Sequence, residues 1–207
     1  MRHYRIIFLL LSSLLLSSCA YHKLASYKKQ KELLITSDNL KPIIPGNGAI
    51  KYKASIDVLN KHFTGTIVLK QTDAETKHLV FVTELGMRMF DLEMKGDSMK
   101  PVFVFDPLNK PQMVNALVRN FETILLVNWF NKNAEIREKS GKVIVYLKNG
   151  KHNMFLKKGE DLFLTEQWVF NTHKKESKTI YSDNYGTIKL KQYGLVKLYI
   201  ELEKINE

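Results

Sequence analysis

Alternation of apolar and polar residues recurs along this chain and predicts a fold made mainly of β-strands. In residues 50–58 every second residue is apolar, and the residues between them are Lys, Ser or Asp. Residues 196–202 repeat the pattern, with Lys197 and Glu201 on the polar side. Successive side chains of a strand point to opposite faces, so each segment predicts a strand with one buried face. Weaker versions of the pattern bring the expected total to about nine to eleven strands, the others lying near residues 63–70, 78–94, 101–105, 143–147, 153–156, 162–170, 179–181 and 186–193.

One segment departs from this alternation and predicts the only long helix. Between residues 114 and 125 the apolar side chains lie three and four positions apart, which is the period of an amphipathic helix. Asn109 is the expected cap, and Pro111 suits the first turn. We expect this helix to end between residues 128 and 133.

The expected architecture follows from combining these elements. A sheet with one apolar side must curl or be covered, because that side would otherwise meet water. We therefore predict a mostly β (α+β) fold, in which a strongly curved antiparallel sheet or incomplete β-barrel carries the helix as a lid on its concave side. The turn sequence Pro45-Gly46-Asn47-Gly48 precedes the first clear strand, so the folded domain is expected to span residues 48–207.

The amino terminus has the pattern of an export signal. Arg2 and Arg5 precede a mostly apolar run over residues 6–16, which is shorter than the roughly 20 residues of a membrane-spanning helix. The sequence Leu16-Ser17-Ser18-Cys19 then resembles the lipobox of bacterial lipoproteins. The alternative is a plain secretory signal, but the only cysteine of the chain lies where a lipobox requires it.

This resemblance implies a lipid anchor and a cellular location. The signal peptide 1–18 would be removed, and Cys19 would carry a diacylglycerol with a further acyl chain on its amino group. Two or three buried chains anchor a protein firmly where a single chain would not. Residues 19–47 are then expected to form the lipidated N-terminus and a flexible tether. An acidic run after Cys19 is missing and residue 20 is Ala, not Asp; by the resemblance both features favour the periplasmic face of the outer membrane.

Charge and motif content exclude several classes of function. The net charge of +11 suits attraction to anionic headgroups or an ordinary solvated basic surface, and export makes nucleic acid an unsuitable partner. A single cysteine excludes a disulfide framework and a thiolate zinc site. No histidine pair has helical spacing, and neither a nucleophile elbow nor a phosphate-binding glycine loop occurs. Asp91 and Glu93 are interpreted as the polar side of a strand. We therefore expect neither an enzyme, a metal site nor a cofactor beyond the acyl chains on Cys19.

Soft apolar residues form the remaining signal. Four methionines lie within residues 87–99, and methionine suits irregular or exchangeable apolar contacts. An ordinary core would explain any one of these residues. A curved sheet under a single helix leaves room for a cavity, however, and we predict that it binds acyl chains. Leu85 and Met87, on either side of Gly86, are the candidates for a loop that inserts into a membrane. The predicted cavity lining is Val102, Phe103, Phe105, Leu117, Phe121 and Leu125.

The order of elements resembles the LolA/LolB superfamily of lipoprotein carriers and receptors. The residues that carry the resemblance are the stretch 83–90 with its Glu84-Leu85-Gly86, the helix that follows Asn109, and the closing segments 185–190 and 196–202. The resemblance implies an incomplete barrel with a helical lid that binds the acyl chains of lipoproteins or other envelope amphiphiles and passes them to the outer membrane. This sequence departs from the family pattern because it has one obvious helix, whereas members of the family usually have more.

The expected partners follow from this reading. They are outer-membrane lipid, a lipoprotein or amphiphile ligand, and a soluble periplasmic carrier, and the chain is expected to act as a monomer. The alternative is a non-catalytic structural or assembly lipoprotein of an envelope complex, which needs an exposed patch but no cavity.

Overall fold

The computed structural model describes residues 20–36, 38–43, 48–127, 129, 132–159, 161–194 and 196–205. The predicted signal peptide and Cys19 lie outside these residues. No helix among the described residues has the length and apolar character needed to span a membrane.

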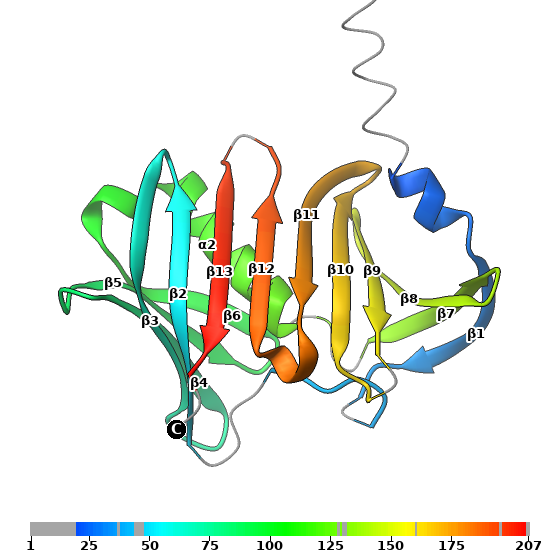
Figure 1. Cartoon of the computed structure of the whole chain (residues 1–207), viewed down its shortest axis with the longest axis horizontal. Coiled ribbons are helices and arrows are strands. Elements are labelled where there is room, and N and C mark those ends of the chain that lie inside the picture. Colours follow the sequence, from blue (N-terminus) through cyan, green and yellow to red (C-terminus); the bar gives the residue numbers. More distant parts are fainter. Residues whose placement is uncertain are drawn as a thin grey trace, which may run out of the picture.

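Thirteen strands form a single antiparallel sheet (Figure 1). Its spatial order is β1-β7-β8-β9-β10-β11-β12-β13-β2-β3-β4-β5-β6, so β1 and β6 are the edges and the sheet does not close into a barrel. The strands are β1 (Lys28–Leu34), β2 (Ala49–Val58), β3 (Lys61–Gln71), β4 (Thr76–Thr83), β5 (Arg88–Lys95), β6 (Ser98–Val104), β7 (Asn133–Lys139), β8 (Lys142–Asn149), β9 (His152–Lys158), β10 (Leu164–Asn171), β11 (Lys174–Tyr181), β12 (Thr187–Gln192) and β13 (Leu198–Lys204).

The pairing of β2 with β13 joins the two ends of the domain. Ile56 lies opposite Ile200, and Ala54 lies opposite Leu202, so their apolar side chains fall on the same buried face. These are the two strands in which the alternation was clearest. The predicted fold class, a curved and open antiparallel sheet with a helix, is confirmed.

The helix α2 (Pro111–Leu125) connects the edge strand β6 to β7, near the opposite edge, and crosses the concave side of the sheet (Figure 1). Its apolar stripe is buried in the main core with side chains from both halves of the sheet. The helix begins after Lys110, whereas Asn109 closes the short 3₁₀ turn η1 (Asp106–Leu108), so the predicted cap is wrong by one residue. It ends at Leu125, earlier than expected, because Leu126 adopts a left-handed conformation with φ of 57°.

Four segments differ from the sequence-based expectation. Residues 28–34, expected in a flexible tether, form β1 and pair with β7, and residues 20–25 form a helical turn. Neither β1 nor β7 was predicted, because neither alternates clearly and most of their side chains are at least partly exposed. The run 78–94 is two strands, β4 and β5, joined by a turn in which Gly86 has φ of +79°.

Candidate functional site

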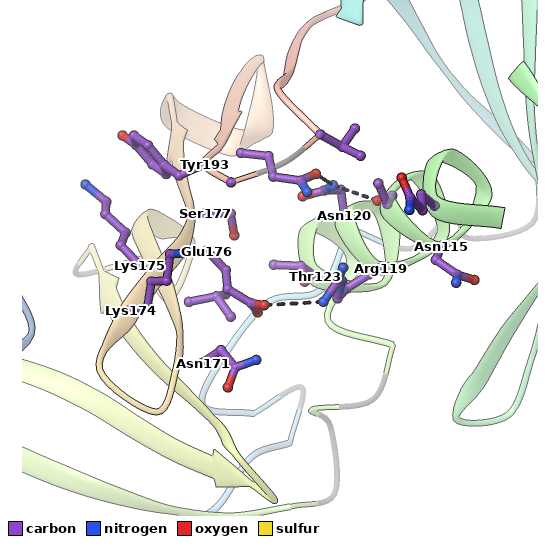
Figure 2. Close-up of a pocket in the computed structure, with 16 residues that line it drawn as sticks. Asn115, Arg119, Asn120, Thr123, Asn171, Lys174, Lys175, Glu176, Ser177 and Tyr193 are labelled. Carbon is purple, nitrogen blue, oxygen red and sulfur yellow. Dashed lines mark hydrogen bonds and ion pairs between the residues drawn. The ribbon is translucent and has the colours of Figure 1, made fainter. Parts of the chain in front are cut away.

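A cleft of about 610 Å³ lies between α2 and the β10–β11 hairpin (Figure 2). This volume is within the range of about 300–1,000 Å³ that is usual for small-molecule sites. The helix contributes one wall, and β10, β11 and the loop after β12 contribute the other. The lining residues are Gln112, Asn115, Ala116, Arg119, Asn120, Thr123, Val169, Asn171, Lys174, Lys175, Glu176, Ser177, Gln192, Tyr193, Gly194 and Val196.

Two side-chain bridges cross this cleft from the helix to the sheet (Figure 2). Arg119 Nη1 lies 3.3 Å from Glu176 Oε1 on β11. The buried amide of Asn120 donates one hydrogen bond to Gln192 Oε1 and another to the main-chain oxygen of Ala116. These bridges hold α2 against the sheet at one side of the cleft, while the lining between them stays accessible.

The charges around the cleft are mainly positive. Arg119, Lys174 and Lys175 line it together with one described carboxylate, that of Glu176. His152 Nε2 lies 3.3 Å from Glu176 Oε2, so the carboxylate lies between an imidazole and a guanidinium. Lys175 Nζ lies 4.5 Å from the ring centre of Tyr193, a distance typical of a cation–π contact.

The floor of the cleft is apolar in part. Ala116 and Val169 are both buried, and Val196 and Tyr193 are half-buried beside the polar walls. A site of this kind can hold a molecule with both an apolar and a negatively charged part. Among the described residues no group of three or more His, Cys, Asp or Glu side chains is arranged to hold a metal ion.

The six residues predicted to line a cavity are divided between the core and the surface. Leu117, Phe121 and Leu125 are buried in the core on the apolar stripe of α2, and none of the three lines the cleft. Phe105 is half-buried and packs against that core.

The other two predicted lining residues lie on the edge strand β6. Val102 is 56% exposed, and Phe103 is half-buried beneath Arg88, whose guanidinium carbon lies 4.3 Å from the ring centre. The structure therefore does not bring the six residues together around one space.

The residues predicted to form a membrane-inserting loop lie at the tip of the β4–β5 hairpin. Leu85 is 93% exposed and Met87 is 42% exposed. The main-chain nitrogens of Gly86 and Met87 donate hydrogen bonds to Thr83, to its main-chain oxygen and its hydroxyl respectively. This tight turn holds the Leu85 side chain out into solvent.

Asp91 is buried and is not a simple exposed strand residue. Its Oδ1 lies 2.8 Å from Nδ1 of His78 on β4, and Arg88 lies 3.6 Å from its other oxygen. None of these three residues lines the cleft. The pairing partly neutralises a carboxylate that burial would otherwise destabilise.

The residues that dominate the cleft were missed at the sequence level. Residues 174–178 lie between the strands expected near 162–170 and 179–181, but they begin β11. The sequence of α2 did contain one signal of a polar site. Asn120 lies four residues after Ala116, and Thr123 lies three residues after Asn120, so both polar side chains fall on the buried stripe of the helix.

Comparison with known proteins gives structural neighbours only. No family model matches the chain, and no curated protein matches it. A LolA superfamily protein from Nitrosomonas europaea is 9% identical, with a TM-score of 0.47, over 79% of this chain and 87% of that one. An outer membrane lipoprotein-sorting protein domain from Vibrio parahaemolyticus is 7% identical, with a TM-score of 0.41, over 79% and 86% of the two chains.

A DUF1329 family protein from Desulfovibrio piger is 9% identical, with a TM-score of 0.40, over 91% of this chain and 88% of that one. Identities this low concern the fold and not the activity. Two of these three solved structures are described as a LolA superfamily protein and an outer membrane lipoprotein-sorting protein domain.

Proposed function

We propose that this chain is a non-catalytic envelope lipoprotein of the carrier or receptor type. In this proposal Cys19 anchors it to the periplasmic face of the outer membrane, and it binds lipoproteins or other amphiphiles through their acyl chains and passes them to that membrane. The observation that carries the proposal is the cleft between α2 and the β10–β11 hairpin, which combines a partly apolar floor with polar walls.

This cleft is only partly apolar, whereas the sequence analysis expected an apolar cavity. The apolar stripe of α2 is buried in the core. An acyl chain would therefore lie in the cleft along Ala116, Val169 and Val196, and not beneath Phe121. Burying apolar surface contributes about 25 cal/mol per Å² before ordering costs are subtracted. A partly apolar floor therefore supports reversible binding, which suits a protein that releases its ligand.

The exposed Leu85 supports the transfer step. A leucine side chain that moves from water into an apolar phase contributes about 1.5–3 kcal/mol. Leu85 is almost fully exposed at a tight hairpin tip, so it can enter a bilayer without unfolding any of the sheet.

Binding of a fluorescent fatty acid to the chain from residue 20 onward tests the proposal, since that chain contains all the described elements. Ser177 points into the cleft from β11, and Lys178 lies on the opposite face of the same strand. We expect Ser177→Phe to weaken probe binding by at least about tenfold because the ring occupies the cleft. Lys178→Phe is the matched control and should bind like the wild type, with urea unfolding used to show that both variants fold.

The packed core favours one other function, that of a structural or assembly lipoprotein. Leu117, Phe121 and Leu125, the three α2 residues predicted to line a cavity, are all buried in the main core. If the wild-type chain binds no fatty-acid probe, if organic extracts of the purified protein contain no lipid, and if envelope proteins co-purify with it, the assembly role replaces the carrier role.

A further inference from the structure

We infer that the cleft between α2 and β11 recognises the negatively charged group, a phosphate or a carboxylate, of an anionic amphiphile. This inference rests on the proposed function and specifies its ligand class. It depends on three arrangements: the cations of the cleft, the position of Glu176, and the place of the cleft mouth in the molecule.

The cations of the cleft come from different elements and line the same space. Arg119 projects from α2, while Lys174 and Lys175 begin β11 (Figure 2). Lys175 and Lys191 lie 4.5 and 5.7 Å from the ring centre of Tyr193, so this ring is flanked by two ammonium groups. Arginine and lysine side chains gathered at a concave site are the usual ligands of phosphate and carboxylate groups.

Glu176 acts as an internal substitute for the ligand's anion. Its Oε1 is 3.3 Å from Arg119 Nη1, and this long contact is the one that the described residues make with the guanidinium fork. Its Oε2 is buried and has no hydrogen-bond partner in the described part of the chain, although His152 Nε2 lies 3.3 Å away. A bound phosphate or carboxylate can take the place of Glu176 on Arg119 and gain Lys174 or Lys175 as a second partner, while His152 still faces Glu176.

The end of the cleft that is lined by Asn171 and Lys174, which we call its mouth, lies beside the amino-terminal end of the described chain. The ring of Tyr21 is 4.5 Å from the ring of His173, the residue directly before Lys174. The turns after β10 and β12 lie at the same end of the molecule as the helical turn 20–25 (Figure 1). A lipid on Cys19 would therefore hold these cations close to the headgroup layer from which an anionic amphiphile is taken.

A second cleft continues the positive rim. It measures about 620 Å³, shares Gln192, Tyr193 and Gly194 with the first cleft, and is bordered by Lys191 and Lys197. The carboxylate of Asp57 also lines it. The two clefts meet at the loop after β12 that they share. A negatively charged ligand group beside Tyr193 would therefore be accessible from both clefts.

Calorimetric titration with three probes tests the inference: dodecyl phosphate, the uncharged dodecyl maltoside below its micellar concentration, and inorganic phosphate. We expect dodecyl phosphate to bind at least about tenfold more tightly than dodecyl maltoside, and added salt to reduce this preference. Arg119→Gln and Lys175→Gln should remove most of the preference. Glu176→Gln should increase it, because the internal competitor is lost.

The control is Lys142→Gln, which removes a positive charge at the start of β8, outside both clefts. It should leave all three titrations unchanged. Equal binding of the two dodecyl probes, or a Glu176→Gln variant that binds dodecyl phosphate more weakly, would overturn the inference and leave the proposed function intact. Binding of inorganic phosphate as tight as that of dodecyl phosphate would retain an anion site and contradict the amphiphile function. Absence of binding by every probe would overturn both.

Discussion

The side-chain amide of Gln167 on β10 donates a hydrogen bond of 3.1 Å to the main-chain oxygen of Thr123, in the last turns of α2. Both residues are buried. The hydroxyl of Tyr181 on β11 in turn donates to Gln167 Oε1 at 2.5 Å. One buried amide therefore joins the helix to two neighbouring strands, close to the floor of the cleft.

Gln167→Leu is expected to destabilise the chain by about 1–3 kcal/mol, because it leaves the Tyr181 hydroxyl buried without this partner. Tyr181→Phe should have a similar cost, since it leaves Gln167 Oε1 without its donor. The double variant should cost less than the sum of the two, because the residues act as one network. Urea unfolding of the four proteins measures this, and strictly additive costs would show that the network has no joint contribution.

Buried tyrosines predict a loss of stability at alkaline pH. Burial raises the pKa of Tyr185 to about 12 and, with a smaller contribution from Tyr185, raises the pKa of Tyr52 to about 12. An unfolded tyrosine ionises near pH 10. The folded state therefore favours the neutral phenol, which adds to the free energy of unfolding. This stabilisation is complete below pH 10 and is lost as the pH rises from 10 to 12.

Each of these two tyrosines should account for on the order of 2 kcal/mol over that interval. Tyr185→Phe will also lose the hydrogen bond of its hydroxyl to the main-chain oxygen of Lys41, so its stability at pH 8 should be lower. The informative quantity is the slope of unfolding free energy between pH 10 and 12, which should become shallower in Tyr185→Phe and in Tyr52→Phe. Slopes identical to that of the wild type would show that other groups control alkaline unfolding.

The fold could be predicted where strands have one buried and one exposed face. β2 and β13 do so, and their alternation was plain in the sequence. β1 could not be predicted, because it lies at an edge and its side chains are almost all exposed. It forms a strand because it pairs with β7, about a hundred residues away along the chain. Pairing between main chains requires no alternation of apolar and polar residues in the sequence of either strand.

The cleft could not be predicted from apolar residues alone. Leu117 and Phe121 suit a cavity lining and a packed core equally well, and only the three-dimensional arrangement shows that they pack. The cleft is formed instead by polar groups such as Arg119 and Glu176, which are 57 residues apart and resemble ordinary solvent-facing charges in the sequence.

Gly65 on β3 is a position where no side chain can be added. A Cβ atom there would lie 2.1 Å from the main-chain oxygen of Val82 and 2.7 Å from Thr83 Cα on β4. Gly65→Ala is expected to cost about 3 kcal/mol or more, because backbone on the neighbouring strand must move. The move would also displace the hairpin tip that carries Leu85, which begins directly after Thr83.

Two measurements check this prediction. Urea unfolding gives the loss of stability, and binding of the protein to liposomes reports the hairpin tip. Thr66→Ala, on the same strand and half-buried, is the control and should change both far less. A Gly65→Ala variant of wild-type stability would show that β4 can shift away from β3 at little cost.

The amino-terminal segment is predicted to be docked and not to act as a free leash. The ring of Tyr21 lies 5.9 Å from Phe155, 5.4 Å from Phe170 and 4.5 Å from His173, measured between ring centres. Aromatic pairs of this kind contribute about 0.5–1.5 kcal/mol each. Tyr21→Ala should therefore release residues 20–25 while leaving the main core, to which Tyr21 does not belong, almost unchanged.

Limited trypsin digestion measures this release, because Lys23 lies on the docked segment and is exposed. Cleavage after Lys23 should become about tenfold faster in Tyr21→Ala, since local opening is no longer opposed by the ring contacts. Tyr193→Ala removes the same side chain from the loop after β12 and should cleave at the wild-type rate. If Tyr21→Ala also cleaves at that rate, the segment opens freely in the wild type, and the cleft mouth beside His173 is not held at a fixed distance from Cys19.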